Sequence, residues 1–195
     1  NLAKKTKIKS KIKQMISGSK INRSENRSVD HFNLRKRGYL ETQEWKTLIN
    51  FTKKISNKKV FKNIVNVGVG GSHLGPSMVN QALKSFYKGP KIFYVSDIDP
   101  INLIEVFEKC NPKTTLFIIT SKSFGTLETL ENAKMIKNWL AESNVTLNDA
   151  MIAVTSSKEK AKKWGFKTSN ILHVSDNIGG RYSLWSSVGI TILFG

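Results

Sequence analysis

The stretch NIVNVGVGGSHLGP (63–76) decides the fold, because an apolar, β-branched run breaks there into a glycine-rich loop that opens a helix-like segment. The stretches TTLFIITSKSFGTLET (114–129) and NILHVSDNIGGRYS (170–183) repeat this organisation. Such a loop directs backbone N–H groups and the positive end of a helix dipole toward one point, which suits an anion. On one parallel sheet, the three loops would meet at the carboxyl ends of the strands, where open α/β sheets bind ligands. The sequence therefore predicts a site for a small phosphorylated molecule.

Strand-like and helix-like segments alternate along residues 61–195. The strand-like runs are continuously apolar, as expected when both faces of a sheet are covered. Strand–helix alternation indicates parallel pairing through right-handed crossovers. The sequence predicts an α/β fold, a three-layer αβα sandwich with a five-stranded parallel sheet. We expect strands at 63–68, 91–96, 115–120, 150–155 and 170–175, and helices at about 75–87, 100–109, 126–142 and 157–164.

The first 60 residues differ from the rest and are predicted to form a basic, mostly helical N-terminal segment. Apolar residues at helical spacing predict helices over 4–17 and 41–56. The stretch 18–38 is polar and irregular, with the start of a helix expected near Arg27. The division is therefore 1–60 for this segment and 61–195 for the α/β domain. At the other end, SLWSSVGITILFG (183–195) predicts a buried helix.

Charge and composition limit the classes of partner. The net charge is +18, and residues 1–60 hold 17 lysines and arginines against 4 acidic residues. A basic arm can bind nucleic acid or an anionic surface, but lysine is abundant throughout this chain and residues 1–20 lack the aromatics that stack on bases. Nucleic acid is therefore not the expected partner. No apolar run reaches the roughly 18–20 residues of a membrane helix, so no membrane association is expected.

Three further observations concern location, completeness and metal binding. The N-terminus has no apolar signal core, and Cys110 stands alone, which fits a reducing, cytoplasmic setting. The sequence begins at Asn1 and stops at Gly195 within an apolar run, so we expect a fragment of a longer protein. Metal binding is not indicated, because His31, His73 and His173 are scattered. We expect neither a metal nor an organic cofactor.

The first loop combines glycines with one hydroxyl group. Glycines at 68, 70 and 71 permit close approach of the backbone to a ligand, Ser72 offers a hydroxyl to a phosphate oxygen, and Pro76 suits a first helical turn. The loop does not match the dinucleotide-binding motif G-x-G-x-x-G, because His73 stands where the last glycine would be. It does not match a P-loop either, because Pro76 stands where the lysine would be. A tight strand–helix turn explains this loop equally well, and His73 is expected to line the loop rather than act as a base.

The second loop carries more hydroxyl groups than a helix cap requires. Ser121, Ser123 and Thr126 fall within six residues, together with Lys122, and Thr126 is placed to cap the following helix. Because one hydroxyl suffices for a cap, the surplus favours anion binding over simple capping.

The third loop places Arg181 directly after a glycine pair. It is the one arginine in residues 61–195, and a guanidinium gives a bidentate grip on delocalised anions. The alternative is a structural ion pair between Arg181 and Asp176.

Four motifs, in order, resemble those of the glucose-6-phosphate isomerase family. VGVGGSHLGP (67–76) is similar to the family's V-G-I-G-G-S-x-L-G-P, and SKSFGTLET (121–129) to its S-K-T-F-T-T-x-E-T. DNIGGRYSLWSSVG (176–189) is similar to D-x-V-G-G-R-Y-S-L-W-S-A-V-G, and INRSENRSVDHFNLR (21–35) to I-N-x-T-E-N-R-A-V-L-H-x-A-L-R. The resemblance implies a sugar-isomerase (SIS) sandwich, which agrees with the five expected strands.

The resemblance also implies an activity. The family interconverts glucose 6-phosphate and fructose 6-phosphate in glycolysis and gluconeogenesis, through an enediolate, without a cofactor and as a homodimer. It implies that Arg181 stabilises the enediolate beside Gly180, and that the sugar phosphate contacts Gly71, Ser72, Ser121, Lys122, Ser123 and Thr126.

The chain departs from the family pattern in two ways. Ser123 stands where the family has a threonine, which keeps the hydroxyl group. Gly125 also replaces a threonine, which is expected to loosen the loop. The family's E-S-N-G-K and G-Q-H elements and its C-terminal catalytic lysine do not occur in residues 1–195, so the resemblance places the acid–base groups beyond Gly195. We expect the fragment alone to be inactive. A non-catalytic SIS module that senses a sugar phosphate remains the alternative.

Overall fold

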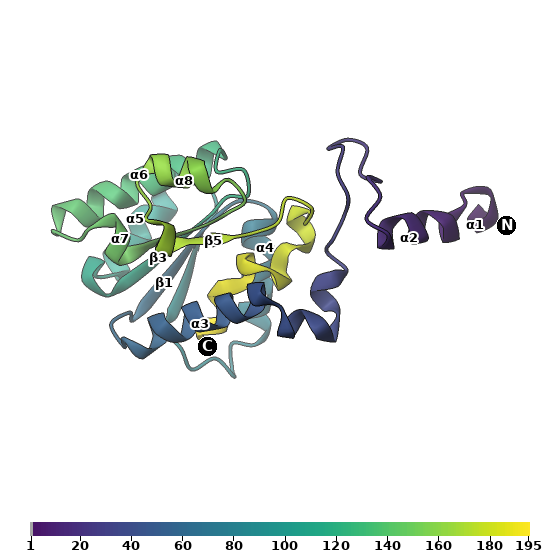
Figure 1. Cartoon of the computed structure of the whole chain (residues 1–195). Coiled ribbons are helices and arrows are strands. Elements are labelled where there is room, and N and C mark those ends of the chain that lie inside the picture. The colour runs from purple at the N-terminus through teal and green to yellow at the C-terminus, as the bar shows by residue number, and fades with distance from the viewer. Residues whose placement is uncertain (1) are drawn as a thin grey trace.

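A computed structural model describes residues 2–195 and shows an α/β sandwich from which an N-terminal helical arm extends (Figure 1). The five strands are β1 Asn63–Val67, β2 Lys91–Val95, β3 Thr115–Thr120, β4 Met151–Thr155 and β5 Ile171–His173. The α-helices are α1 Leu2–Lys5, α2 Ile8–Ile16, α3 Gln43–Asn57, α4 Gly71–Ala82, α5 Pro100–Lys109, α6 Leu127–Glu142, α7 Leu147–Ala150 and α8 Lys158–Trp164. The 3₁₀ helices are η1 Asn33–Arg35, η2 Arg37–Glu41, η3 Pro112–Thr114, η4 Thr168–Asn170, η5 Gly180–Trp185 and η6 Ser187–Phe194.

The sheet is parallel throughout and has the order β2-β1-β3-β4-β5. The predicted five-stranded α/β fold is confirmed. From β1 the chain moves outward to β2, then returns to β3 on the other side and continues to β5. The direction reverses between β1 and β3, whose register pairs Val67 with Ile119. This reversal is a topological switch point, where open α/β sheets form ligand crevices.

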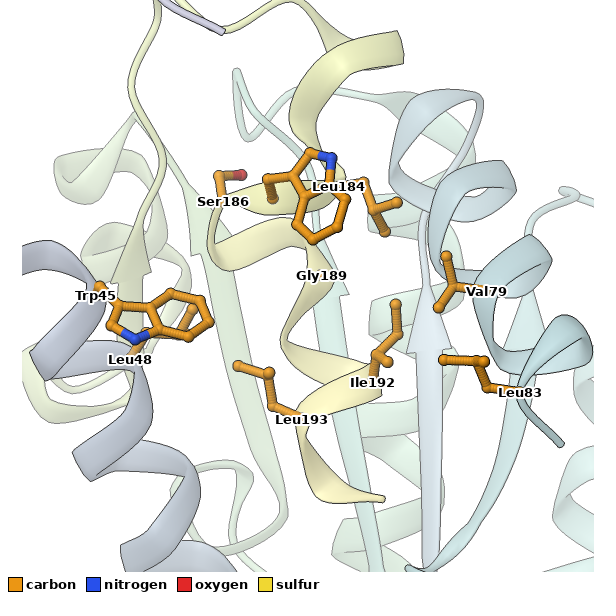
Figure 2. Close-up of a pocket in the computed structure, with 10 residues that line it drawn as sticks. Trp45, Leu48, Val79, Leu83, Leu184, Ser186, Gly189, Ile192 and Leu193 are labelled. Carbon is orange, nitrogen blue, oxygen red and sulfur yellow. The ribbon is translucent and has the colours of Figure 1, made fainter. Parts of the chain in front are cut away.

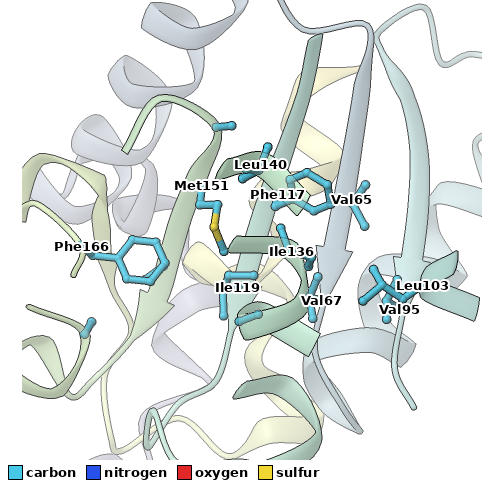
Figure 3. Close-up of a cluster of buried hydrophobic side chains, with 14 of the residues drawn as sticks. Val65, Val67, Val95, Leu103, Phe117, Ile119, Ile136, Leu140, Met151 and Phe166 are labelled. Carbon is cyan, nitrogen blue, oxygen red and sulfur yellow. The ribbon is translucent and has the colours of Figure 1, made fainter. Parts of the chain in front are cut away.

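Alternate residues of the strands supply the two apolar cores, one on each face of the sheet. Val65, Phe117 and Ile119 pack against α5, α6 and α8 on one face, where Ile136 and Leu140 of α6 are fully buried (Figure 3). Ile64 and Ile118, the residues next along each strand, point to the opposite face. Continuous apolar runs arise because both faces are covered.

The second face is covered by segments from both ends of the chain. Leu48 of α3 and Val188, Ile190 and Phe194 of η6 belong to the same buried cluster as Ile64. The helix α4 packs against η5 and η6, which brings the C-terminal run beside the first loop. Helix α3, predicted within the N-terminal segment, therefore shares a core with the sheet.

Three local predictions need correction. Helix α4 begins at Gly71 rather than near residue 75, so Pro76 lies inside the helix and not in its first turn. The region near Arg27 forms a short bridge with Asn22, and the helical turns begin only at Asn33.

The C-terminal run forms η5 and η6 instead of one helix. The hydroxyls of Ser183 and Ser186 each donate to the carbonyl three residues earlier, at 2.6 Å, which supports tight 3₁₀ turns. The backbone of Ser186 is extended, so it separates the two turns, and its hydroxyl also caps η6.

Candidate functional site

The three predicted loops meet at the carboxyl end of the sheet. The first follows β1, the second follows its neighbour β3, and the third follows β5 and returns toward α4. A side chain at Gly68 would lie 2.9 Å from the carbonyl oxygen of Thr120, so the first two loops are in close contact. A side chain at Gly71 would collide with the carbonyl of Gly180, so the first and third loops also touch.

The backbone turn of the first loop requires glycine at position 70. Gly70 has φ 58° and ψ −122°, a combination that side chains exclude, and it precedes the first turn of α4. Gly71 and Ser72, both half-buried, are the first two residues of that helix. Their place at a helix N-terminus, beside the third loop, suits an anion in the crevice.

The second loop brings two of its hydroxyl groups together. Ser121 Oγ and Thr126 Oγ1 lie 3.0 Å apart, and Ser121 Oγ also accepts from the backbone N–H groups of Gly125 and Thr126 at 3.4 Å. Ser121 is buried, whereas Ser123 is exposed. Thr126 occupies the N-cap position of α6, but its side chain makes no capping bond. The prediction that its hydroxyl caps the helix is therefore wrong.

The second loop is anchored in the core by the ring of Phe124. Phe124 has φ 45°, which is unusual for a residue with a side chain, and it is only 4% exposed. Its ring makes edge contacts with Trp164 and Phe166 of the α8 region. Among residues 2–195, the backbone N–H groups of Lys122 and Ser123 have no hydrogen-bond partner. Two donors at the start of the loop are thus available to a ligand.

Lys122 connects the second and third loops through its side chain. Its Nζ donates to the carbonyl oxygens of Asp176 and Ile178, both at 3.2 Å. Its own carbonyl accepts from the hydroxyls of Thr155 and Ser156 at the end of β4, at 2.9 and 2.7 Å. The ammonium group is therefore structural, and a ligand would meet the Lys122 backbone.

Arg181 is exposed in the first turn of η5, directly after Gly180. The alternative of an Arg181–Asp176 ion pair is wrong, because the Asp176 carboxylate pairs with Arg27 at 3.4 Å. Arg27 Nη1 also donates to the Asp176 carbonyl at 3.0 Å, which attaches the N-terminal motif to the third loop. A polar cavity of about 300 Å³ opens between these segments, lined among others by Arg27, His31, Gly180 and Arg181.

His73 lies in the first turn of α4. Burial lowers its pKa below the ordinary value of 6.5, because it disfavours the charged imidazolium. Its ring meets Tyr94 of β2 edge-on, with centroids 5.5 Å apart. These contacts direct the ring toward β2.

Sequence reasoning missed Asn66, which is the last but one residue of β1 and is fully buried. Its side chain bonds to Ser72, Thr120 and Thr191. The signal was present as a carboxamide within the otherwise apolar strand NIVNV, since a buried polar side chain needs partners.

Two absences concern residues 2–195, the part of the chain that the structure describes. No group of three or more His, Cys, Asp or Glu side chains in this part of the chain is arranged to hold a metal ion. None of the helices described has the length and apolar character needed to cross a membrane.

The parallel sheet and the loops at its switch point define a doubly wound α/β protein of the sugar-isomerase type. The family model of phosphoglucose isomerase matches residues 1–195. The chain belongs to the phosphoglucose isomerase family, and the resemblance carried by the four motifs is confirmed.

Relatives and solved structures agree with this assignment. A glucose-6-phosphate isomerase from Buchnera aphidicola subsp. Acyrthosiphon pisum (strain 5A) is 40% identical, covering 99% of this chain and 39% of that protein. Another from Francisella philomiragia is 38% identical, covering 98% and 40%. A crystal structure of a glucose-6-phosphate isomerase from Chlamydia trachomatis matches with a TM-score of 0.83 and 26% identity, covering 100% of this chain and 41% of that one. The chain thus spans about two fifths of the curated relatives it matches.

Proposed function

We propose that these residues are the phosphate-binding part of an aldose–ketose isomerase that interconverts D-glucose 6-phosphate and D-fructose 6-phosphate. The observation that carries the proposal is the convergence of three loops at the switch point in a chain of this family. The contact of Gly71 with Gly180 and the bonds from Lys122 to the third loop support it.

The phosphate group binds in the second loop. Two hydroxyls, from Ser121 and Thr126, the free N–H groups of Lys122 and Ser123, and the N-terminus of α6 offer donors to a dianion. The first loop adds Gly71 and Ser72 at the N-terminus of α4. Binding energy from this remote group positions the reacting carbons.

The reaction proceeds by acid–base chemistry. After ring opening, a carboxylate removes the proton at C2, giving a cis-enediolate, and returns it at C1. The family's glutamate for this step belongs to an element that does not occur in residues 1–195. Arg181, next to Gly180, offsets the negative charge that develops on the enediolate oxygens.

The assembly and location of the whole protein follow from the same proposal. We infer a cytoplasmic homodimer, with residues 1–60 and 61–195 as an N-terminal segment and an SIS domain. Gel filtration with light scattering of the full-length protein measures the assembly, and a monomer under assay conditions would contradict the dimer.

Replacing Arg181 in the full-length protein tests the activity. The Arg181→Ala variant should lose about 10²–10³-fold in kcat, the usual effect of removing one charge-stabilising donor. Arg35→Ala is the matched control, since Arg35 is exposed and bonds to the carbonyl of His31. Full turnover in Arg181→Ala would refute the proposed role.

A binding measurement separates the isomerase from a sensor. Fructose 6-phosphate should shift the amide NMR signals of Ser121–Thr126 in the full-length protein, together with turnover. Binding without turnover in the wild-type protein would favour the non-catalytic SIS module, and absence of both would contradict any sugar-phosphate function.

A further inference from the structure

Asn66 lies near the carboxyl end of β1 and bonds to three other elements. Its Nδ2 donates to the carbonyl oxygen of Ser72 in α4 at 2.9 Å. Its Oδ1 accepts from the hydroxyl of Thr191 in η6 at 3.1 Å and, at the longer distance of 3.5 Å, from that of Thr120 in β3. Asn66, Thr120 and Thr191 are all 1% exposed or less. These three side chains are therefore isolated from water.

The chemistry of the partners fixes the orientation of the carboxamide. The Ser72 carbonyl can only accept a hydrogen bond, so it requires the NH₂ end of Asn66. The hydroxyls of Thr120 and Thr191 can donate, so they satisfy the oxygen end. A flipped amide would place two carbonyl oxygens against each other. One orientation alone satisfies all three partners.

Pro76 explains why the Ser72 carbonyl is available within a helix. In a regular α-helix this carbonyl would accept from the backbone N–H four residues later, which is position 76. Proline has no N–H, so this bond is missing and the half-buried Ser72 carbonyl lacks its helical donor. Asn66 supplies the donor that Pro76 lacks. The motif from 67 to 76 and the asparagine before it thus act as one structural unit.

Each partner of Asn66 leads into one of the three loops. Ser72 belongs to the first loop, and Thr120 is directly followed by Ser121 of the second. Thr191 lies in η6, which packs against η5, the element that carries Arg181. A change at Asn66 should therefore alter the positions of all three loops.

We propose that Asn66 is a positioning residue that holds the three loops at the spacing a sugar phosphate requires. The inference rests on the proposed isomerase function. Asn66 touches neither the solvent nor the crevice, so it acts through Ser72, the second loop and η5. Its loss should weaken substrate binding in a protein that still folds.

Two sets of variants of the full-length protein test this role. Asn66→Asp keeps the shape but places an oxygen against the Ser72 carbonyl. Thr191→Val removes one hydroxyl from the network, and Thr191→Ser restores it. Two control variants lie outside the network. Thr52 in α3 donates to the Leu48 carbonyl at 2.9 Å, so Thr52→Val removes another buried hydroxyl. Asn63→Ala changes the other asparagine of β1.

Steady-state kinetics and thermal unfolding are measured for each variant with fructose 6-phosphate. Because Asn66→Asp leaves the Ser72 carbonyl without its donor and displaces the first loop, KM should rise about ten- to hundred-fold in this variant. It should rise less in Thr191→Val and return to the wild-type value in Thr191→Ser. Thr52→Val and Asn63→Ala should lower Tm without changing KM.

The pH dependence of Asn66→Asp adds a readout that loss of stability would not produce. A protonated carboxyl can donate to the Ser72 carbonyl, so KM of this variant should fall toward the wild-type value as pH decreases. The wild-type profile, measured alongside, accounts for titration of the substrate phosphate.

The outcomes separate the two proposals. An active wild-type protein whose Thr191→Val and Asn66→Asp variants keep the wild-type KM would overturn the positioning role and leave the isomerase intact. A wild-type protein that neither binds nor converts fructose 6-phosphate would overturn the proposed function, and the inference with it. If Asn66→Asp does not fold, the comparison of Thr191→Val with Thr191→Ser decides.

Discussion

Gly71 shows how the absence of one side chain sets the distance between two loops. Its backbone torsions are those of an ordinary helix residue, so conformational freedom does not explain the glycine. The reason is contact, because a Cβ would overlap the carbonyl of Gly180. Gly125 differs, since a Cβ there would meet its nearest neighbour, Ser123 Oγ, at 3.6 Å.

The Gly71→Ala variant should therefore separate the first and third loops. We expect a loss of about 1–3 kcal/mol in the free energy of unfolding, as for overpacking elsewhere, and weaker binding of fructose 6-phosphate. Gly125→Ala, the matched control, should gain about 0.4–1 kcal/mol because the unfolded chain loses freedom. Urea unfolding measures both, and equal effects of the two changes would show that contact with Gly180 is not the cause.

Glu44 is a carboxylate in an unfavourable environment. Its Oε1 is buried without a partner among the described residues, and its pKa is raised first by burial and then by the charge of Asp30. The folded state thus binds this proton more tightly than the unfolded state, so stability falls as pH rises from the ordinary value of 4.5 through the raised pKa.

We accordingly expect Glu44→Gln to be more stable than the wild type at neutral pH. The difference should disappear below about pH 4, where the glutamate is protonated in both states. Unfolding curves recorded from about pH 3 to 8 measure it, with the exposed Glu41→Gln as control. A stability difference that does not change with pH would rule out titration of Glu44 as its source.

At the scale of elements, the sequence predicted strands more accurately than helix starts. Buried strands are recognisable in the sequence as continuous apolar runs. The predicted bounds of all five strands lie within a few residues of the observed ones. The start of α4 was misplaced because Pro76 reads as a first-turn residue, whereas here Asn66 compensates for it inside the helix. The site residues lie on loops that converge, but the sheet order that brings them together depends on long-range pairing absent from any local pattern.

The caps of α3 and α6 provide a matched pair of threonines. Thr42 caps α3, accepting from the Trp45 N–H at 3.3 Å, whereas the Thr126 side chain leaves α6 uncapped. Thr42→Val should cost about 1 kcal/mol in the free energy of unfolding, and Thr126→Val less than about 0.5 kcal/mol. Only Thr126→Val should weaken phosphate binding. A destabilisation by Thr126→Val as large as that by Thr42→Val would show that its hydroxyl supports the helix after all.

At the scale of the molecule, charge and apolar surface are unevenly distributed. The arm formed by α1 and α2 extends from the sandwich and has no buried residue (Figure 1). A second feature lies on the face of the sandwich opposite α6, where α3, α4, η5 and η6 enclose an apolar groove (Figure 2). Its cavity of about 220 Å³ is lined among others by Trp45, Leu184 and Leu193, without a charged side chain. None of the residues that line the groove also lines the cavity beside Arg181.

This groove should bind apolar probes in the 195-residue chain, because contiguous exposed apolar surface is a binding surface. Trp185 lies at its edge and is 53% exposed, so Trp185→Gln should reduce the fluorescence of bound anilinonaphthalene sulfonate with little change in stability. Phe86→Gln is the control, because Phe86 is 76% exposed but lies outside the residues that line the groove. Since the probe is anionic and the chain carries a charge of +18, the titration is repeated at high salt to remove binding to the lysines. Equal signal from both variants at high salt would place the probe elsewhere and show that the groove is closed to ligands.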